Sequence, residues 1–308
     1  MNKIKIIKIL VFFVVAIFLL IFSERIWQNL ETKVPTGLES RLNNFFGRKT
    51  ILERQAKKEE ISVAVLEGKN ISEITSLLVA KKLVNSEDFY LFAGKAKTDY
   101  RLMSDLLWPK DYSLTFTFLK DKPKYYSLEG YLFPDTYRFF SDARADEIIV
   151  KMLENFDKKL TPKMREDIAA QGRSIFEIVT MASLIEKEAP INYASGENHD
   201  AKIISGIFWN RLKNGQALQS CATLAYVLGE NKPQYSEADT KVNSPFNTYL
   251  NKGLPPAPIA NPGILAIEAA IYPIDNEYNY FLTPAGTKKI IFSRTYEEHL
   301  INKNKYLD

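Results

Sequence analysis

The chain has 308 residues, 46% of them hydrophobic and 25% charged, which is an ordinary composition for a folded protein with room for about two domains. Its 41 basic and 37 acidic residues leave a net charge of only +4 and form no run of one sign, so the charge does not indicate a nucleic-acid partner. A single cysteine, Cys221, excludes an internal disulfide and a cysteine-cluster zinc site, and the two histidines, His199 and His299, lie 100 positions apart. We therefore expect a chemistry without a metal or another cofactor.

The amino-terminal segment predicts a membrane anchor. Three lysines precede an uncharged run over residues 9–22, and the apolar character begins at residue 4, which makes the stretch just long enough to span a bilayer. The charges in front of it predict a cytoplasmic N-terminus. A cleaved signal peptide is the alternative, but the small-residue cleavage pattern is missing. We expect residues 1–22 to form an uncleaved single-pass anchor that contacts the cell membrane through residues 4–22. The remainder would then be extracytoplasmic, where large insoluble substrates are possible and NAD, ATP and coenzyme A are scarce.

The next part of the chain predicts a stalk followed by a small folded module. Residues 23–60 are charged and irregular, which is typical of a stalk. The sequence ISVAVL at residues 61–66 predicts a strand. Asn70 and Glu73 have the spacing of a capping box at the start of an amphipathic helix, and Ser86 is expected to cap a second helix. This strand, helix, helix order is typical of LysM-like glycan-binding modules, although many small modules share it.

We assign residues 61–125 to this LysM-like module and a connecting strand region, and residues 126–308 to a second, catalytic domain. The connecting strand is predicted at residues 112–119, where YSLTFTFL alternates in polarity. The second domain begins with an aromatic-rich segment, LEGYLFPDTY at residues 128–137. Aromatic rings next to carboxylates suit sugar faces, but core packing is the commoner reason for such a cluster.

The rest of the second domain predicts helices and strands without βαβ regularity, so the expected fold class is α+β. The loop GLPPAPIANPG at residues 253–263 is rich in proline and glycine, and its rigid backbone could form one wall of a cleft. A hairpin is expected from residues 278–283 and 289–293 around Gly286. Further helices are predicted at residues 146–160, 174–189, 201–212, 264–271 and 295–307.

Two carboxylates of one predicted helix, Glu186 and Glu188, differ in their expected surroundings. The helix begins at Ser174, which forms a capping box with Glu177. At about 100° per residue, Glu186 falls within the apolar sector, whereas Glu188 falls outside it and is expected to be solvated or paired with a basic residue. A carboxyl against apolar walls is harder to ionise and can act as a general acid. The alternative for Glu186 is an ordinary buried glutamate paired with an arginine or lysine.

Other chemistries have weaker support. The chain lacks the serine and lysine pair of penicillin-binding enzymes, the GxSxG elbow, the HExxH helix and the glycine patterns of nucleotide sites. Cys221 could be a nucleophile paired with His199 or His299, but a lone cysteine is more often a small, half-buried residue. Glu186 is therefore the main catalytic candidate.

Four further segments share an order and spacing with a known family. After LEGYLFPDTY come MASLIEKEA at residues 181–189, RLKNGQALQSCATLAY at 211–226, SPFNTY at 244–249 and GLPPAPIANPG at 253–263. Together they resemble the YceG-like (MltG) endolytic murein transglycosylases over most of residues 61–308. Members of that family are membrane-anchored, carry a LysM-like module and cut peptidoglycan glycan strands internally, leaving 1,6-anhydro-N-acetylmuramic acid ends that terminate strand elongation.

The resemblance implies roles for several residues. Glu186 corresponds to the catalytic glutamate, and no second carboxylate is needed because the C6 hydroxyl of the muramic acid attacks C1. Gln219, Asn247, Thr248 and Tyr249 are expected to contact sugar groups, since amides, hydroxyls and aromatic rings suit neutral sugars. The alternative is structural: Asn247 would brace a turn and Tyr249 would fill the core.

One departure and two rival functions stay open. Many relatives have an aspartate where this chain has Cys221, so a carboxylate there cannot be essential to this mechanism. A glycan-polymerising synthase is an expected partner by resemblance only. The first rival function is a membrane-tethered scaffold that binds peptidoglycan without cutting it. The second is a hydrolytic muramidase, which adds water and leaves reducing ends.

Overall fold

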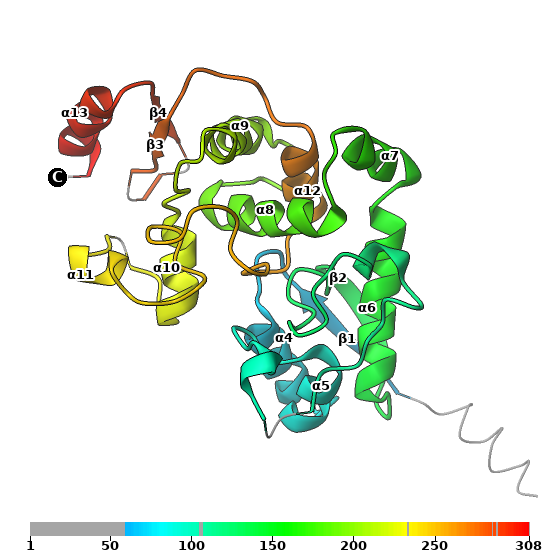
Figure 1. Cartoon of the computed structure of the whole chain (residues 1–308). Coiled ribbons are helices and arrows are strands. Elements are labelled where there is room, and N and C mark those ends of the chain that lie inside the picture. The colour runs from blue at the N-terminus through cyan, green and yellow to red at the C-terminus, as the bar shows by residue number, and fades with distance from the viewer. Residues whose placement is uncertain (1–58, 105–106, 233, 285, 288, 308) are drawn as a thin grey trace, which may run out of the picture. The chain divides into compact units, whose positions relative to one another are not determined.

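The computed structural model describes residues 59–104, 107–232, 234–284, 286–287 and 289–307 (Figure 1). The segment from Glu60 onward forms one compact unit, and the description below concerns that unit. The predicted anchor at residues 1–22, and all of the predicted stalk except its last two residues, lie outside the described residues. Within the described ranges, no single helix is both long and apolar enough to cross a membrane.

A two-stranded antiparallel sheet joins the two predicted domains. β1 (Glu60–Val65) pairs with β2 (Asp135–Phe140) along its whole length, with Val63 opposite Tyr137. β1 buries alternate residues, as its sequence predicts, and confirms the expected strand. Because β1 lies in the predicted module and β2 in the predicted catalytic domain, the sheet holds the two parts of the chain together.

The helices after β1 follow the sequence signals closely. α4 (Ile71–Ala80) begins with the predicted capping box, in which Asn70 and Glu73 exchange two hydrogen bonds of 2.9 Å. α5 (Ser86–Ala93) also forms, but its cap is Asn85, whose Oδ1 accepts from the Asp88 N–H at 2.8 Å. The order strand, helix, helix is therefore present, and its likeness to a LysM unit stays a prediction.

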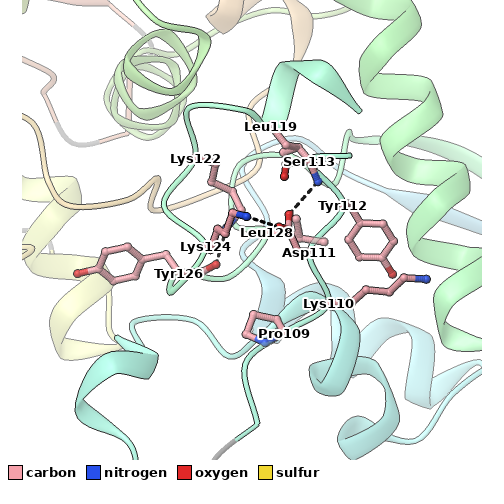
Figure 2. A pocket seen from close by; sticks show the side chains of 10 residues that line it. All are labelled: Pro109, Lys110, Asp111, Tyr112, Ser113, Leu119, Lys122, Lys124, Tyr126 and Leu128. Atoms are coloured by element: carbon pink, nitrogen blue, oxygen red, sulfur yellow. Dashed lines mark hydrogen bonds and ion pairs between the residues drawn. The ribbon is translucent and has the colours of Figure 1, made fainter. Parts of the chain in front are cut away.

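The predicted strand at residues 112–119 is wrong. Residues 107–116 form neither a strand nor a helix, and they lead into a 3-10 turn, η2 (Thr117–Leu119); another, η1 (Tyr100–Leu102), lies earlier in the chain. The alternation arises because Phe118 packs on Phe156, with ring centroids 4.8 Å apart, rather than from pairing with another strand. The Lys122 ammonium donates to the Pro123 and Tyr126 carbonyls, at 2.9 and 2.5 Å, and so braces the following loop. Lys122 and Tyr126 also line a hollow of only about 10 Å³ (Figure 2). That hollow has room for about one water molecule.

The rest of the unit is mostly helical and is built around α8. Eight consecutive residues of α8, from Ile178 to Ile185, are buried. This helix contacts α7, α9, α10 and α12 (Figure 1). The helices are α6 (Ala145–Lys159), α7 (Pro162–Ala170), α8 (Ile175–Glu188), α9 (His199–Lys213), α10 (Cys221–Leu228), α11 (Glu237–Thr240) and α12 (Ile264–Ile271).

The C-terminal elements complete an α+β fold, which confirms the predicted class. β3 (Tyr280–Leu282) and β4 (Ile291–Ser293) form the predicted antiparallel hairpin, and α13 (Tyr296–Tyr306) packs against both strands. The predicted helices that became α6, α8, α9, α12 and α13 are confirmed to within a few residues. The sequence analysis missed β2, α7, α10 and α11.

Candidate active site

A cleft of about 1030 Å³ lies beside the C-terminal turn of α8. Its walls come from segments that are far apart in the sequence: the turn after β1, the end of α8, α10, the hairpin and α13. Its polar lining residues include Lys187, Glu188, Arg211, Gln219, Tyr249, Tyr280 and His299. Apolar residues such as Phe208 and Leu218 line it as well, so a hollow of this size suits a large ligand that has both polar groups and apolar faces.

Glu186 is not among the residues that line this cleft, but it lies next to Gly68 and Lys187, which are. Its Oε2 atom accepts two hydrogen bonds, from the Tyr193 hydroxyl at 2.5 Å and from the Gly263 N–H at 3.0 Å. Burial raises the pKa of Glu186 to about 7, against the opposing effect of these two donors. A group with this pKa is protonated in a useful fraction near neutral pH and can both give and take a proton.

Local sequence signals place Glu186. α8 begins with the predicted capping box, in which Ser174 and Glu177 bond to each other through side chain and backbone. Glu186 then falls in the last turn of the helix. Gly263 is the residue that precedes α12, so its N–H points out of the positive end of that helix toward the carboxyl.

The border between Glu186 and the cleft is formed by Gly68. Gly68 lines the cleft and has a φ of 73°, a left-handed conformation that glycine adopts without strain. A Cβ atom at this position would lie 3.5 Å from Cγ of Glu186 and 3.6 Å from Cδ of Lys187. Gly68 therefore packs against the half-buried Glu186 on one side and lines the cleft on the other, which places Glu186 next to the cleft.

Glu188 was expected to be solvated or paired with a basic residue, but it is partly buried and its hydrogen bonds come from the start of α10. Its Oε1 accepts from the Ser220 hydroxyl at 2.5 Å and from the Ala222 N–H at 3.0 Å, at the start of α10. Desolvation raises the pKa of Glu188, while these donors and the nearby Arg211 charge oppose the rise. The reason for the error is tertiary: α10, which the sequence analysis missed, packs against the face of α8 that was expected to meet water.

Two of the predicted contact residues, Gln219 and Tyr249, line the cleft. Gln219 has a φ of 52°, which is uncommon for a residue with a side chain and is typical of functional sites. Its N–H donates to the Thr248 carbonyl at 3.1 Å, which leaves the side-chain amide exposed. The Tyr249 hydroxyl lies 3.2 Å from Sγ of Cys221.

The other two, Asn247 and Thr248, do not reach the cleft, and their prediction as direct contacts is corrected here. Asn247 is 0% exposed; its amide donates to the Thr240 and Val242 carbonyls at 3.0 and 2.8 Å, and its Oδ1 accepts from the Tyr249 N–H. The Thr248 hydroxyl accepts from the Ser220 N–H at 3.0 Å. Both side chains brace the turn that presents Tyr249 and Gln219, which is the structural role that the sequence left open for Asn247.

Cys221 is exposed at the first position of α10 and its hydrogen-bond partner is Tyr249, not a histidine. Partial desolvation, with the neighbouring Glu188 carboxylate, raises the pKa of the thiol. A nucleophilic cysteine needs the opposite shift, because the thiolate is the reactive form. This geometry does not favour the nucleophile hypothesis for Cys221.

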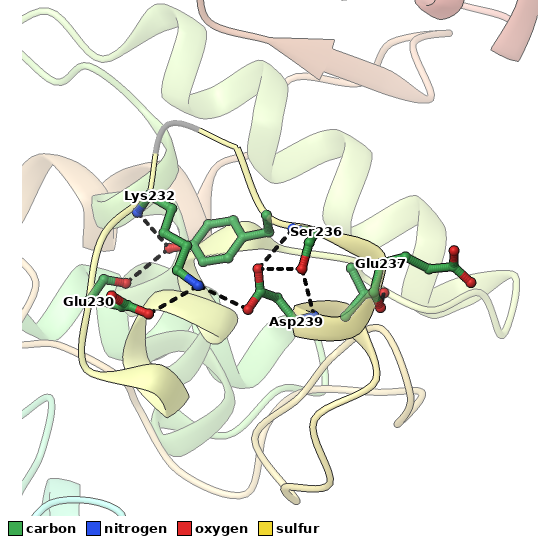
Figure 3. A network of polar contacts seen from close by, with 7 residues as sticks. Glu230, Lys232, Ser236, Glu237 and Asp239 are labelled. Atoms are coloured by element: carbon green, nitrogen blue, oxygen red, sulfur yellow. Dashed lines mark hydrogen bonds and ion pairs between the residues drawn. The ribbon is translucent and has the colours of Figure 1, made fainter.

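A network of charged and polar side chains holds the loop after α10, which forms another part of the cleft wall (Figure 3). The Lys232 ammonium lies 3.0 Å from carboxylate oxygens of both Glu230 and Asp239. Asp239 also completes a capping box with Ser236 at the start of α11. Because these pairs are only partly buried, each adds little stability.

The sequence analysis did not identify Tyr193, Glu67 or Gly263 as part of the site. Tyr193 lies in an irregular segment between α8 and α9 and has no motif around it. Gly263 belongs to the loop that was expected to form a cleft wall, so the segment was found but its contact with Glu186 was not. Among the described residues, no group of three or more His, Cys, Asp or Glu side chains is arranged to hold a metal ion.

The chain is similar to proteins of known family. The profile of the YceG-like family matches residues 39–305. The endolytic murein transglycosylase of Bacillus subtilis (strain 168) is 37% identical over 180 residues, which cover 58% of this chain and 48% of that protein. The protein of the same name from Streptococcus pneumoniae serotype 2 is 34% identical over 186 residues, which cover 59% of this chain and 32% of that protein.

The aligned parts thus span about half or less of the length of these relatives. A crystal structure of a putative yceG-like protein from Listeria monocytogenes matches the fold with a TM-score of 0.65 and 34% identity, covering 79% of this chain and 76% of the other. The profile match extends over most of the chain and includes every segment that forms the site described above. The chain therefore belongs to the YceG-like family.

Proposed function

We propose that this protein is an endolytic murein transglycosylase. It would cleave the bond between N-acetylmuramic acid and N-acetylglucosamine within nascent peptidoglycan strands and leave 1,6-anhydro-N-acetylmuramic acid ends, which stops strand elongation. The observation that carries the proposal is the Glu186 carboxyl, with a pKa raised by burial to about 7, next to a cleft of about 1030 Å³. The names of the related proteins from Bacillus and Streptococcus support it.

Glu186 serves as both acid and base in the proposed reaction. Its protonated form donates the proton to the bridging glycosidic oxygen while the bond from that oxygen to C1 of the muramic acid breaks. The oxygen of the C6 hydroxyl then bonds to C1, and its proton returns to the Glu186 carboxylate. No water is consumed, the enzyme ends in its starting protonation state, and the products are an anhydro end and a free 4-hydroxyl.

The cleft offers contacts for the sugars on either side of that bond. The exposed amide of Gln219 can bond to N-acetyl groups and hydroxyls, and the ring of Tyr249 can cover an apolar sugar face. Asn247 and Thr248 support these two residues from behind. We assign substrate contact to Gln219 and Tyr249, and bracing to Asn247 and Thr248.

The proposed setting of the enzyme follows the sequence. Residues 1–22 would anchor it in the cell membrane, residues 23–60 would form a stalk, and the part from residue 61 onward would work outside the cytoplasm. Residues 61–125 would form the LysM-like module that holds the glycan, beside the catalytic part at residues 126–308. A peptidoglycan synthase is the partner that such an activity on nascent strands calls for.

The function is tested by digesting isolated peptidoglycan with the full chain and analysing the products by mass spectrometry. We expect anhydro-ended fragments from the wild type and none above background from Glu186→Gln. Glu154→Gln, on the exposed face of α6, is the matched control and should behave as wild type. Equal product from wild type and Glu186→Gln would refute the assignment of the catalytic residue.

Glu188→Gln separates the two carboxylates of α8. Glu188 lines the cleft, so it is a rival for the role of acid, but its Oε1 atom is held by two donors from α10. Glutamine keeps an acceptor oxygen for these donors, and we therefore expect Glu188→Gln to retain much of the activity. If Glu188→Gln is inactive and Glu186→Gln is active, the acid is Glu188.

The same analysis distinguishes the rival functions. A hydrolytic muramidase would give fragments with reducing muramic acid ends in place of anhydro ends. A scaffold without catalytic activity would leave the strand length unchanged while binding the glycan. Since Glu186 combines a raised pKa with two hydrogen-bond donors on one oxygen, the structure favours an enzyme over a scaffold.

A further inference from the structure

A second carboxylate, that of Glu67, approaches Glu186 from the turn between β1 and α4. Glu67 is half-buried, and its Cγ packs against Gly263, the residue whose N–H binds Glu186. A Cβ atom added to Gly263 would lie 2.6 Å from Cγ of Glu67 and 2.5 Å from the Tyr193 hydroxyl oxygen. The side chains of Glu67 and Tyr193 therefore cover the same face of Gly263. Tyr193 also bonds to the Glu186 carboxyl, and the Glu67 charge acts on that carboxyl.

The backbone around Glu67 is held in place by the loop that carries Gly263. The Gly68 N–H donates to the Asn261 carbonyl at 3.0 Å, and the Asn261 N–H donates to the Lys69 carbonyl at 2.9 Å. Asn261 is fully buried, and its Oδ1 accepts from the Gly130 and Leu132 N–H groups. The turn with Glu67 is thus fixed to the loop at residues 253–263, although Glu67 and Glu186 lie 119 positions apart in the sequence.

The groups that face Glu186 act on its charge in two directions. The Tyr193 hydroxyl, the Gly263 N–H and the Lys187 ammonium favour the carboxylate, whereas burial and the Glu67 carboxylate favour the protonated form. Both hydrogen bonds end on Oε2 of Glu186. The acid proton is therefore expected on Oε1, the oxygen that these two donors leave free for the substrate.

We propose that Glu67 and Tyr193 are positioning residues that act on the Glu186 proton in opposite directions, Glu67 retaining it before bond cleavage and Tyr193 stabilising the carboxylate after it has left. This inference rests on the proposed function for its catalytic meaning. It also gives the amino-terminal strand and turn a part in the active site, in addition to any grip on the glycan.

Two conservative substitutions test the proposal through the pKa of Glu186 itself. The full chain, purified in detergent with 13C-labelled glutamate carboxyls, is titrated by NMR, and the Glu186 signal is identified by its loss in Glu186→Gln. We expect Tyr193→Phe to raise the pKa of Glu186 and Glu67→Gln to lower it, each by about one unit. Tyr272→Phe and Glu154→Gln are the matched controls; Tyr272 is exposed at the end of α12 opposite to Gly263, and its hydroxyl donates to Asp167 at 2.7 Å rather than to Glu186.

The pH profile of kcat/KM gives the second readout. Because the acid must be protonated in the free enzyme, the alkaline limb should move to higher pH in Tyr193→Phe and to lower pH in Glu67→Gln. A displacement of one unit would change kcat/KM at pH 8 by up to about tenfold. A purely structural role would lower the rate at every pH without moving the limb.

The outcomes are distinguishable. Opposite shifts in the NMR titration support the proposal, whether or not the protein cuts glycan. Shifts in the same direction, or a pKa of Glu186 that neither variant changes, overturn it. If the wild type yields no anhydro ends while the two variants still shift the Glu186 titration oppositely, the proposed function fails and the coupling of the three residues stands.

Discussion

Two glutamates, the buried Glu129 and the half-buried Glu186, have raised pKa values for the same reason but differ in what surrounds their oxygens. Burial raises the pKa of Glu129 to about 8 and that of Glu186 to about 7. Glu129 is 1% exposed, and protein donors reach both of its oxygens: the Ile71 N–H and the Asn261 amide bond to Oε1, and the Tyr226 hydroxyl bonds to Oε2. In Glu186 both donors bond to one oxygen.

The difference shows that a perturbed pKa alone does not identify a catalytic residue. The Glu129 carboxyl joins the start of α4, the loop at Asn261 and α10, and it has no route to a substrate. The Glu186 carboxyl is held at one oxygen and lies behind Gly68, which lines the cleft. One group connects parts of the fold, and the other keeps its Oε1 atom without a donor from the described residues.

The largest expected effect is on catalysis. Glu186→Gln should lower the rate of release of anhydro-ended fragments by about 100-fold to 10,000-fold, the usual contribution of a general acid and base. Its thermal unfolding should stay close to that of the wild type, because glutamine still accepts from Tyr193 and Gly263. Digestion kinetics and calorimetry of the same sample check both parts. If Glu186→Gln instead loses both its activity and its thermal stability, Glu186 is a structural residue like Glu129.

Glu129→Gln should leave glycan cleavage unchanged and alter the pH dependence of the free energy of unfolding. In the unfolded chain this carboxyl titrates near 4.5, whereas in the folded protein it titrates near 8. Between these values the folded state holds a proton that the unfolded state has lost, so the free energy of unfolding falls as the pH rises from about 4.5 to about 8. Glutamine does not titrate, and the fall should be smaller in the variant by on the order of a few kcal/mol.

The measurement is urea unfolding of wild type and Glu129→Gln at several pH values between 5 and 8.5. Glu186 lowers the free energy of unfolding with rising pH in both proteins alike. The difference between their two curves therefore reports Glu129 alone. Parallel curves for the two proteins would mean that Glu129 stays ionised in the fold. A selective loss of glycan cleavage with unchanged stability would be evidence for a catalytic role that the geometry does not indicate.

Most of the fold that could be predicted came from local patterns. The capping boxes of Asn70 with Glu73 and of Ser174 with Glu177, the strand β1 and the C-terminal hairpin all depend on residues that are close in sequence. α10 was missed because CATLAYVL is short and apolar on most sides, so its periodicity does not distinguish a helix from a buried strand. The strand predicted at residues 112–119 does not form. The alternation of polar and apolar residues there arises from the packing of individual side chains and not from pairing with another strand.

The site was predictable at one residue and not in its surroundings. The apolar sector of α8 and the family motif both indicated Glu186, but Glu67 and Tyr193 reach it through tertiary contacts that no spacing reveals. The same limit explains why Asn247 and Thr248 were expected to contact the sugar. Their polar side chains suit a sugar in the sequence, and only the fold shows that backbone groups already use them.

Asn247→Ala tests that correction and should act on stability. It removes two bonds to the Thr240 and Val242 carbonyls and one from the Tyr249 N–H, all in a buried place. Leaving buried groups without partners should lower the free energy of unfolding by about 1–3 kcal/mol. The exposed neighbour Asn243 provides the control, since Asn243→Ala should change stability by less than about 0.5 kcal/mol. A large loss of activity with unchanged unfolding would return Asn247 to the substrate contacts.

The smallest effect is expected at Cys221, where the cleft meets the start of α10. Serine keeps a group that can bond to the Tyr249 hydroxyl, so Cys221→Ser should change the free energy of unfolding by less than about 0.5 kcal/mol and leave cleavage close to wild type. A catalytic nucleophile would lose activity by orders of magnitude on the same change. Alkylation by a bulky maleimide supplies the positive control: because Cys221 lines the cleft with Gln219 and Tyr249, the adduct should block cleavage in the wild type and not in Cys221→Ser. An alkylated wild type with full activity would show that glycan does not bind along this wall, and that the carboxyl of Glu186 is reached from another direction.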